Sequence, residues 1–369
     1  MSTFLLAPDK FKGSLDAHSV ASAIAEGIRR AIFDANIIEA PMADGGEGTL
    51  EILVRALQGQ RRRVAATGPH GEPIEAPVGL IHQASTAVIE LASIAGHAMV
   101  PEGRHNPLLT TTFGVGQAIR AAIETGIEEI TLTLGGSATV DGGIGMMQAL
   151  GMTFLDSGGR LIQTQLSGGD LAKIDRLVWD KPPDNFENVQ FTIACDVLNP
   201  ACGPNGAARI FGPQKGADEA GVRILEAGME KWAGILERMT GRPLHEEPGT
   251  GAAGGVALPL LALANAHVVP GVDLVAECLG LAEKMIGADL VITGEGKLDR
   301  QSMMGKVVGA VGRMAQSAGV PCIALVGTAG EGADECLTLI EDFYALNGPI
   351  EKTAERLADL AESVIHDYQ

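Results

Sequence analysis

Three glycine-rich segments, each between an apolar run and a stretch with helical periodicity, constrain the fold of this chain most. They read MADGGEGT over residues 42–49, GGSATVDGG over 135–143 and TGEGKLD over 293–299. A strand that ends in a tight glycine loop and continues as a helix is the basic unit of α/β folds. The sequence therefore predicts an α/β architecture built from strand–loop–helix units.

The order of the units predicts two domains. A chain of 369 residues exceeds the usual size of a single core. Strand and helix alternate regularly at both ends, whereas from Arg61 short alternating pieces joined by Pro and Gly indicate antiparallel hairpins. We therefore expect a discontinuous parallel-sheet outer domain over 1–62 and 287–369, an inserted α/β domain over 63–286, and the active site in the cleft between them.

Individual elements follow from periodicity and capping residues. A helix with Val20, Ile24 and Ile28 on one stripe should begin at Ser14 or Asp16. Further helices are expected over 49–57 and 114–123, after Gly143, and after the 249–255 glycine run. Strands are expected over 4–7, 37–40, 130–134, 191–195, 290–293, 323–326 and 343–346.

Composition excludes several functional classes. The formal net charge of −19 argues against nucleic acid or an anionic membrane as a partner. The five cysteines form no C-x-x-C pair, which favours reduced thiols in a cytoplasmic protein. We find neither a signal-peptide pattern nor an apolar run long enough to span a membrane.

Glycine loops that also carry carboxylates indicate joint handling of phosphate and metal. Glycine lets backbone N–H groups approach an anion, and a following helix adds the positive end of its dipole. Carboxylates such as Asp44 and Asp141 would repel that anion unless a hard cation such as Mg²⁺ lies between them. As plain helix caps they would instead contribute about 1 kcal/mol. Asp196, at a strand end, is either a base or metal ligand or a simple turn residue.

Standard nucleotide signatures do not explain the loops. Gly249-x-Gly251-x-x-Gly254 matches the dinucleotide fingerprint formally, but no apolar strand precedes it, so helix-packing glycines are favoured. We find no P-loop and no protein-kinase motif set. Two alternative functions from other functional classes remain open. They are a nicotinamide-dependent hydroxyacid oxidoreductase and a catalytically silent protein that binds a sugar acid.

Eight segments together resemble the type I glycerate kinases, a bacterial family that includes glycerate 2-kinase. The resemblance runs over essentially the whole length. Val140 departs from it, because Asn is expected before Asp141. The segments are Ala7–Ser14, Ala43–Thr49, Asn106–Thr112, Gly135–Gly143, Ala194–Pro200, Phe211–Ala217, Gly251–Gly255 and Val291–Asp299.

The resemblance implies two α/β domains, one inserted in the other, and ATP-dependent phosphorylation of D-glycerate to 2-phosphoglycerate with Mg²⁺. Phosphorylation of the 3-hydroxyl, or of another small hydroxy acid, is the alternative. On this basis Asp196 and Lys12 are expected to be catalytic, and Thr110, Thr111 and Thr112 to bind substrate. D-glycerate and ATP are the expected partners, and the sequence leaves open whether the chain forms a homo-oligomer. The expected phosphate-binding residues are Lys10, Gly135, Gly136, Ser137, Gly294, Gly296 and Lys297, and the expected metal ligands are Asp44, Asp141 and Glu295.

Overall fold

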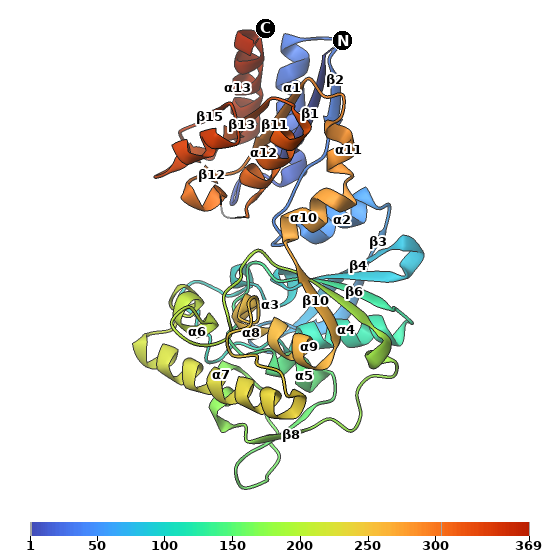
Figure 1. The fold of residues 1–369 in the computed structure, drawn as a ribbon, viewed down its shortest axis with the longest axis vertical. Coiled ribbons are helices and arrows are strands. Elements are labelled where there is room, and N and C mark those ends of the chain that lie inside the picture. The colour runs from blue at the N-terminus through green and yellow to red at the C-terminus, as the bar shows by residue number, and fades with distance from the viewer. Residues whose placement is uncertain (1, 304, 369) are drawn as a thin grey trace. The chain divides into compact units, whose positions relative to one another are not determined.

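The chain folds into two compact units, one of them discontinuous in sequence. In a computed structural model that describes residues 2–303 and 305–368, unit 1 comprises Met1–Ile52 and Pro270–Gln369, and unit 2 comprises Leu53–Val269. Figure 1 shows the blue and red ends of the chain together in unit 1 and the cyan, green and yellow middle in unit 2. Each unit has its own sheet and its own core.

Unit 1 is a wholly parallel five-stranded sheet in the order β15-β13-β11-β1-β2. Its helices cover the sheet, and α1 packs along α13. Asp16 caps α1, accepting a hydrogen bond from Ser19 N at 2.7 Å, and was one of the two expected caps. The strands are β1 (Thr3–Pro8), β2 (Asn36–Glu39), β11 (Leu290–Gly294), β13 (Cys322–Val326) and β15 (Asp342–Ala345). The helices are α1 (Ala17–Ala31), α10 (Gly271–Cys278), α11 (Leu281–Met285), α12 (Val307–Ala318) and α13 (Thr353–Tyr368), and β12 (Lys297–Leu298) pairs with β14 (Thr328–Ala329). Helix α2 (Thr49–Ala56) spans the limit between the two units at Ile52 and Leu53.

The strand order of unit 1 creates a topological switch point. From β1 the chain passes through α1 to β2 on one side, whereas β11 lies on the other side of β1 and leads outward to β13 and β15. Open α/β sheets bind ligands in the crevice outside the carboxyl ends of the strands where this reversal occurs. In unit 1 that position is the pair of residues that follow β1 and β11, namely Asp9 and Glu295.

Unit 2 has a mixed six-stranded sheet in the order β10-β9-β6-β5-β4-β3. Strands β3, β4 and β5 pair antiparallel, as the hairpin pattern after Arg61 predicted. The antiparallel pattern covers only part of the middle of the chain, because β5, β6, β9 and β10 are parallel neighbours. The bounds are β3 (Gln60–Thr67), β4 (Pro73–Ile81), β5 (Thr86–Glu90), β6 (Glu129–Thr133), β9 (Gln190–Ala194) and β10 (Asn265–Val269), and a small hairpin pairs β7 (Thr153–Leu155) with β8 (Arg176–Val178).

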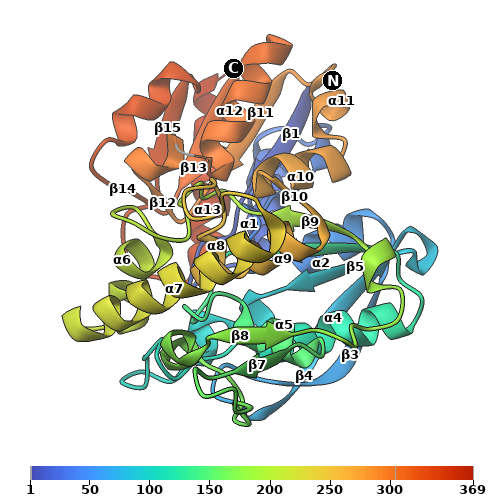
Figure 2. The same cartoon turned by 60° about the horizontal axis from the view of Figure 1, so that its bottom comes forward.

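A long helix closes the core of unit 2. Helix α7 packs against α6 and α9, and the views of Figures 1 and 2 show α7 running along one side of the unit. Its Trp232 is fully buried and donates from Nε1 to Gly142 O at 2.9 Å, which ties α7 to the second glycine loop. The helices are α3 (Ala92–Ala95), α4 (Phe113–Glu124), α5 (Ile144–Ala149), α6 (Ala207–Phe211), α7 (Glu219–Thr240), α8 (Ala252–Gly255) and α9 (Ala257–Leu263).

The limits of the two units differ from the expected boundaries at 62/63 and 286/287. Strand β3 pairs along its whole length with β4, so the chain belongs to unit 2 from before Gln60. On the return, α10 and α11 pack on α12, and a Cβ on Gly271 would meet Asp44 O at 2.5 Å. These contacts place residues 270–286 in unit 1.

The 249–255 glycines serve close packing, as the missing strand before them indicated. Gly254 has a φ of +76°, and a Cβ there would lie 2.0 Å from Thr139 O, a contact that no side chain tolerates. A Cβ on Gly251 would meet Pro200 O at 2.1 Å. Within residues 2–303 and 305–368, no helix combines the length and apolar character needed to cross a membrane.

Candidate functional site

Two buried carboxylates meet at the switch point of unit 1. Pro8 and Gly294 are opposite each other in the parallel β1–β11 pair, and Asp9 N donates to Gly294 O at 2.8 Å. Asp9 and Glu295 therefore leave the sheet side by side, with only 8% and 5% of their surfaces exposed. Burial raises the pKa of Asp9 to about 6, and the negative charge of Asp44 adds to this rise while Lys10 opposes it.

The ionised form of Glu295 is less favourable than that of Asp9, as the pKa of Glu295 shows. Burial raises the pKa of Glu295 to about 7, with Asp9 and Asp299 also raising it and a hydrogen bond from Ser302 and the charge of Lys306 lowering it. Its Oε1 atom is buried and has no hydrogen-bond partner. A buried carboxylate oxygen without a donor is costly and calls for an explanation, such as a missing ion.

The positive side chains around this edge differ in how freely they can reach a ligand. Lys10 is half-buried, with Nζ 3.7 Å from Asp9 Oδ1, whereas Lys12 is exposed. Lys297 is also exposed and pairs with Asp299 at 3.0 Å. Lys306 occupies the N-cap position of α12 without a side-chain capping bond, and sequence reasoning passed over it because Gly305-Lys306 does not complete a P-loop.

The remaining unit 1 candidates have contrasting positions. Asp44 is half-buried and accepts a hydrogen bond from Gly46 N at 3.1 Å, as an ordinary loop carboxylate does. Gly294 is buried within β11, where a Cβ would meet Leu325 O at 2.1 Å, so close strand packing accounts for this glycine. Gly296 is half-buried, and a Cβ there would lie 3.2 Å from Lys12 N. Gly296 thus lets the Lys12 loop approach the end of β11.

In unit 2 the carboxylate of Asp141 is fully buried and saturated with hydrogen bonds. Its Oδ2 accepts from Thr112 N at 2.8 Å and from Thr112 Oγ1 at 2.7 Å, and its Oδ1 accepts from Gly143 N at 3.1 Å. Burial raises the pKa of Asp141, while these hydrogen bonds lower it. The arrangement fixes the 135–143 loop and favours a positioning role over the predicted metal contact.

The three threonines expected to bind substrate are buried and use their hydroxyls internally. Thr110 Oγ1 donates to Ala138 O at 3.0 Å, and Thr111 Oγ1 accepts from Phe113 N at 3.1 Å. Thr112 Oγ1 also accepts from Met146 N at 2.9 Å. The structure thus brings this run together with Asp141, but as support for the glycine loop. Direct contact of these hydroxyls with substrate stays a prediction.

A buried lysine that sequence reasoning missed supports the same loop. Lys215 is 4% exposed and donates from Nζ to Ser137 Oγ at 2.6 Å and to Thr139 O at 2.7 Å. Burial lowers the pKa of Lys215 to about 7, and the negative charge of Asp141 opposes the shift. A lone lysine between Pro213 and Gly216 is normally taken for a solvated loop residue, so only the family resemblance signalled it.

The backbone of the 135–137 loop reaches the surface at the carboxyl edge of the unit 2 sheet. Gly135 is half-buried and Gly136 is exposed, whereas Ser137 is buried. Asp196 follows β9, the strand next to β6, and is half-buried. Because β6 and β9 are parallel neighbours, the glycine loop and Asp196 emerge at the same edge. The functional role of Asp196 stays a prediction.

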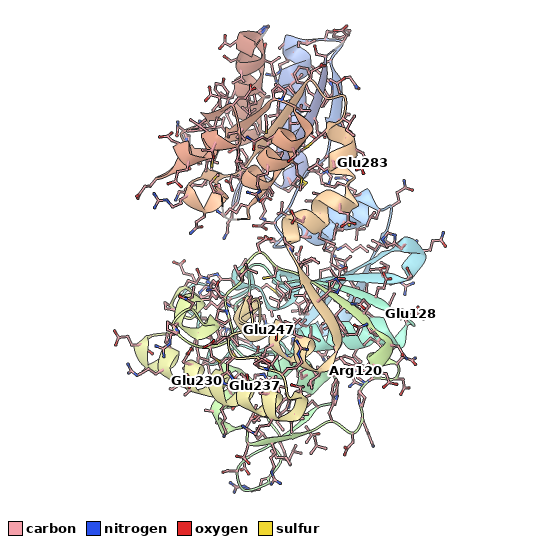
Figure 3. All side chains as sticks on the ribbon, in the orientation of Figure 1. Arg120, Glu128, Glu230, Glu237, Glu247 and Glu283 are labelled. Atoms are coloured by element: carbon pink, nitrogen blue, oxygen red, sulfur yellow. The ribbon has the colours of Figure 1, made fainter. Side chains whose placement is uncertain are left out.

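One carboxylate near the end of helix α7, that of Glu237, is explained by structural contacts. Figure 3 labels Glu230 and Glu237, both on α7. Glu237 Oε1 lies 2.8 Å from His245 Nδ1, and this interaction, with the Leu244 backbone N–H, lowers the pKa of Glu237 to about 2. These contacts anchor the 241–247 segment to the end of α7. They give no reason to place chemistry there.

The carboxylates fit Mg²⁺ only in its usual, partly hydrated form. Among the described residues, no group of three or more His, Cys, Asp or Glu side chains could hold a metal ion. Mg²⁺ keeps several waters and commonly uses one or two carboxylates together with substrate phosphates. Glu295, with its unpartnered buried oxygen, meets that requirement, and fully bonded Asp141 does not.

Comparison with known proteins gives one consistent result. The sequence model of the Glycerate kinase family matches residues 4–369. A glycerate kinase of Halalkalibacterium halodurans is 44% identical over 332 residues, covering 90% of this chain and 87% of the relative. The glycerate 2-kinase of Escherichia coli is 40% identical and covers 88% of this chain and 84% of its own. A crystal structure of a putative glycerate kinase 2 from Salmonella typhimurium matches with a TM-score of 0.86 at 34% identity, covering 100% of this chain and 98% of that one.

Proposed function

The chain belongs to the glycerate kinase family, and from this premise we propose that it transfers the γ-phosphoryl group of ATP to D-glycerate to form 2-phosphoglycerate. The observation that carries the proposal is the pairing of buried carboxylates with nearby lysines at a topological switch point. Phosphoryl transfer requires little covalent chemistry and depends on positioning and charge neutralisation. Both requirements match the groups described above.

Unit 1 supplies the charge-neutralising groups in this proposal. Lys10, Lys12 and Lys297 bind the phosphates or the substrate carboxylate, since each is at least partly exposed at the carboxyl edge of the sheet. Asp44 and Glu295 hold Mg²⁺ directly or through water. When bound, Mg²⁺ neutralises phosphate charge and aligns the phosphoryl group.

Unit 2 supplies the positioning groups. The exposed backbone at Gly136 and half-buried Asp196 follow neighbouring parallel strands at one sheet edge, which suits a loop that contacts a phosphate or carboxylate near a base. We assign Asp196 to orient the attacking hydroxyl and accept its proton. Asp141, Thr112 and Lys215 hold the loop in place. The expectation that a single active site forms from both units stays a prediction.

Coupled measurement of ADP formation tests the reaction class. We expect turnover that requires both D-glycerate and a divalent cation and stops in excess chelator. Absorbance at the NADH wavelength, recorded with glycerate and a nicotinamide cofactor, tests the oxidoreductase rival. ADP release that does not respond to glycerate would contradict the proposal. Undiminished turnover in chelator would contradict its metal component alone.

The identity of the product is tested separately. Glycerate offers a primary hydroxyl at C3 and a more hindered secondary hydroxyl at C2, so transfer to C2 requires a firmly held carboxylate that aligns the C2 oxygen with the γ-phosphate. The glycerate 2-kinase of Escherichia coli, 40% identical over 324 residues, supports this choice. Phosphorus NMR distinguishes the two esters. A spectrum dominated by 3-phosphoglycerate would reverse the regiochemistry and leave the kinase assignment intact.

The proposed cellular location is the cytoplasm. All five cysteines are free, and Cys195, Cys202, Cys322 and Cys336 are buried. Burial raises the pKa values of the Cys195 and Cys336 thiols to about 11, which makes them unreactive. Free, inert thiols suit a reducing compartment. Fractionation of the native host with an antibody to this chain tests the location.

A further inference from the structure

Asp9, which sequence reasoning did not single out, has the strongest structural link to the proposed metal ligand Glu295. The two residues continue adjacent parallel strands directly after the paired positions Pro8 and Gly294. The hydrogen bond from Asp9 N to Gly294 O, at 2.8 Å, extends the ladder by one step and fixes their spacing. Neighbouring parallel strands lie about 4.8 Å apart, so the two carboxylates start from positions that one cation can bridge.

Burial makes this pair unlike other carboxylates at the edge. Asp9 and Glu295 are both more than nine-tenths buried, and Oε1 of Glu295 has no hydrogen-bond partner. Asp44 is only half-buried. Asp9 and Asp44 each accept one hydrogen bond from a backbone N–H, from Lys10 at 2.7 Å and from Gly46 at 3.1 Å, so burial is what separates them. Two buried like charges side by side need a counter-charge. The ammonium of Lys10 supplies part of this counter-charge, with Nζ 3.7 Å from Asp9 Oδ1, which is longer than a hydrogen bond. Glu295 Oε1 receives no hydrogen bond from any group.

We propose that Asp9 and Glu295 are the two protein ligands of the divalent cation and that Asp44 acts only from outside its coordination shell. This inference rests on the proposed function, because a kinase supplies the phosphate oxygens that complete the octahedron. Two carboxylates and water also account for the lack of a three-residue metal cluster among the described residues.

Binding of Mn²⁺ to the full-length protein, without nucleotide, tests the ligands independently of turnover. Free Mn²⁺ is measured by electron paramagnetic resonance for the wild type and for Asp9→Asn, Glu295→Gln and Asp44→Asn. The matched control is Asp34→Asn, which removes one exposed negative charge just before β2, at the opposite edge of the same sheet. We expect the first two variants to lose affinity at least about tenfold. Asp44→Asn should lose no more than about threefold, as expected when a partly exposed charge acts only through solvent, and Asp34→Asn should bind as the wild type does.

A second measurement on the wild type guards against variants that fail to fold. Bound Mn²⁺ broadens NMR signals of nearby amides, so titration should first broaden the amides of Glu295 and Gly296 and of Lys10. The amides of Gly142 and Gly143, which surround Asp141, should stay sharp. Early broadening at Gly142 and Gly143 with sharp signals at Gly296 would overturn the proposal. So would wild-type affinity in folded Asp9→Asn and Glu295→Gln.

The outcomes separate this proposal from the proposed function. If the wild type forms ADP with glycerate but Mn²⁺ binding survives both substitutions, the ligand assignment fails and the kinase function stands. If Mn²⁺ binding is lost in both variants but the wild type forms no ADP with glycerate, the metal site stands and the reaction is wrong.

Discussion

Buried charged side chains at the carboxyl edges of the two sheets differ in how many of their hydrogen-bonding atoms have partners. In unit 1, Asp9 and Glu295 are buried next to each other, and one oxygen of Glu295 has no partner. In unit 2, the carboxylate of Asp141 accepts three hydrogen bonds and the ammonium of Lys215 donates two. The side chains are buried to a similar extent in both places, whereas the number of hydrogen bonds that they make differs.

This difference shows that burial of a charge does not by itself identify a binding group. A buried charge whose hydrogen bonds are made within the fold stabilises the loop that surrounds it and has little capacity left for a ligand. A buried charge with an unused oxygen is a cost that a cation can remove on binding. We therefore interpret the unit 1 edge as a site prepared for a ligand and the polar network of unit 2 as a scaffold.

The largest effect is expected from Asp196, the half-buried carboxylate that follows β9 in unit 2. Asp196→Asn should lower kcat about 10²–10⁴-fold with little change in KM, because a positioned base acts mainly in the transition state. Steady-state kinetics with ATP and D-glycerate measure this, and Asp180→Asn, at an exposed loop position in unit 2, is the control. A change in kcat below about threefold would show that Asp196 is a turn residue.

Removing the scaffold cation should destabilise the protein. Lys215→Met keeps the length of the side chain but leaves Ser137 Oγ and Thr139 O without their donor, at an expected cost of about 2–5 kcal/mol. Urea unfolding followed by circular dichroism measures the loss. Lys231→Met, which removes a single bond to Ala172 O, should stay within about 0.5 kcal/mol of the wild type. Equal effects of both substitutions would remove the distinction between scaffold and surface.

The same lysine predicts a pH dependence of stability. The pKa of Lys215 is about 7 in the folded protein and near 10.5 when unfolded, so the folded state binds fewer protons between these values. Stability from this group should therefore rise as pH increases from about 7 towards 10.5, and fall as pH returns towards 7. Urea midpoints across this range measure the slope. Lys215→Met should flatten it, and an unchanged slope would place the titrating group elsewhere.

A smaller effect is expected from an exposed lysine of unit 1. Lys12→Ala should raise KM for ATP or for D-glycerate about tenfold, as expected for one lost charge-assisted contact, while the unfolding midpoint stays unchanged. Lys352→Ala, an exposed lysine of the same unit, provides the comparison. Loss of thermal stability, or two unaltered Michaelis constants, would show that Lys12 does not bind substrate.

The smallest effect, and the one of opposite sign to Lys215→Met, concerns Glu295. In chelator, Glu295→Gln should leave the protein as stable as the wild type or more stable by up to about 1 kcal/mol, because the amide removes a buried charge that lacks a full set of partners. Urea unfolding at pH 7.5 measures the change. A marked destabilisation would mean that the unit 1 carboxylates are a scaffold as well.

Periodicity and turn chemistry were sufficient to predict most of the backbone. The strands at 4–7, 290–293 and 323–326 and the Asp16-capped helix are confirmed within a residue or two. Strand β10 was missed because its sequence NAHVV, partly exposed, has no clear apolar pattern. Without β10, the four-stranded parallel part of unit 2 could not be recognised from spacing alone.

The site was less accessible to sequence reasoning because residue type does not determine side-chain direction. Asp44 and Asp141 occupy the same Asp-Gly-Gly pattern, yet one is half-buried and the other is enclosed with three donors. The three threonines have ligand-like chemistry but point their hydroxyls inward. Lys215 becomes meaningful only when folding brings it to Ser137, 78 residues away in sequence.

The pairing of β1 with β11 also determines the order in which this chain can be completed. Thr293 Oγ1 donates to Ala7 O across a sequence separation of 286 residues, whereas unit 2 is one uninterrupted segment. During synthesis β1 cannot pair with β11 until the whole of unit 2 has left the ribosome. Unit 2 can meanwhile fold as a unit and bring the two halves of unit 1 together. The insertion thus acts as a folding intermediary, and mutations that slow its folding would delay formation of the metal-binding edge without touching it.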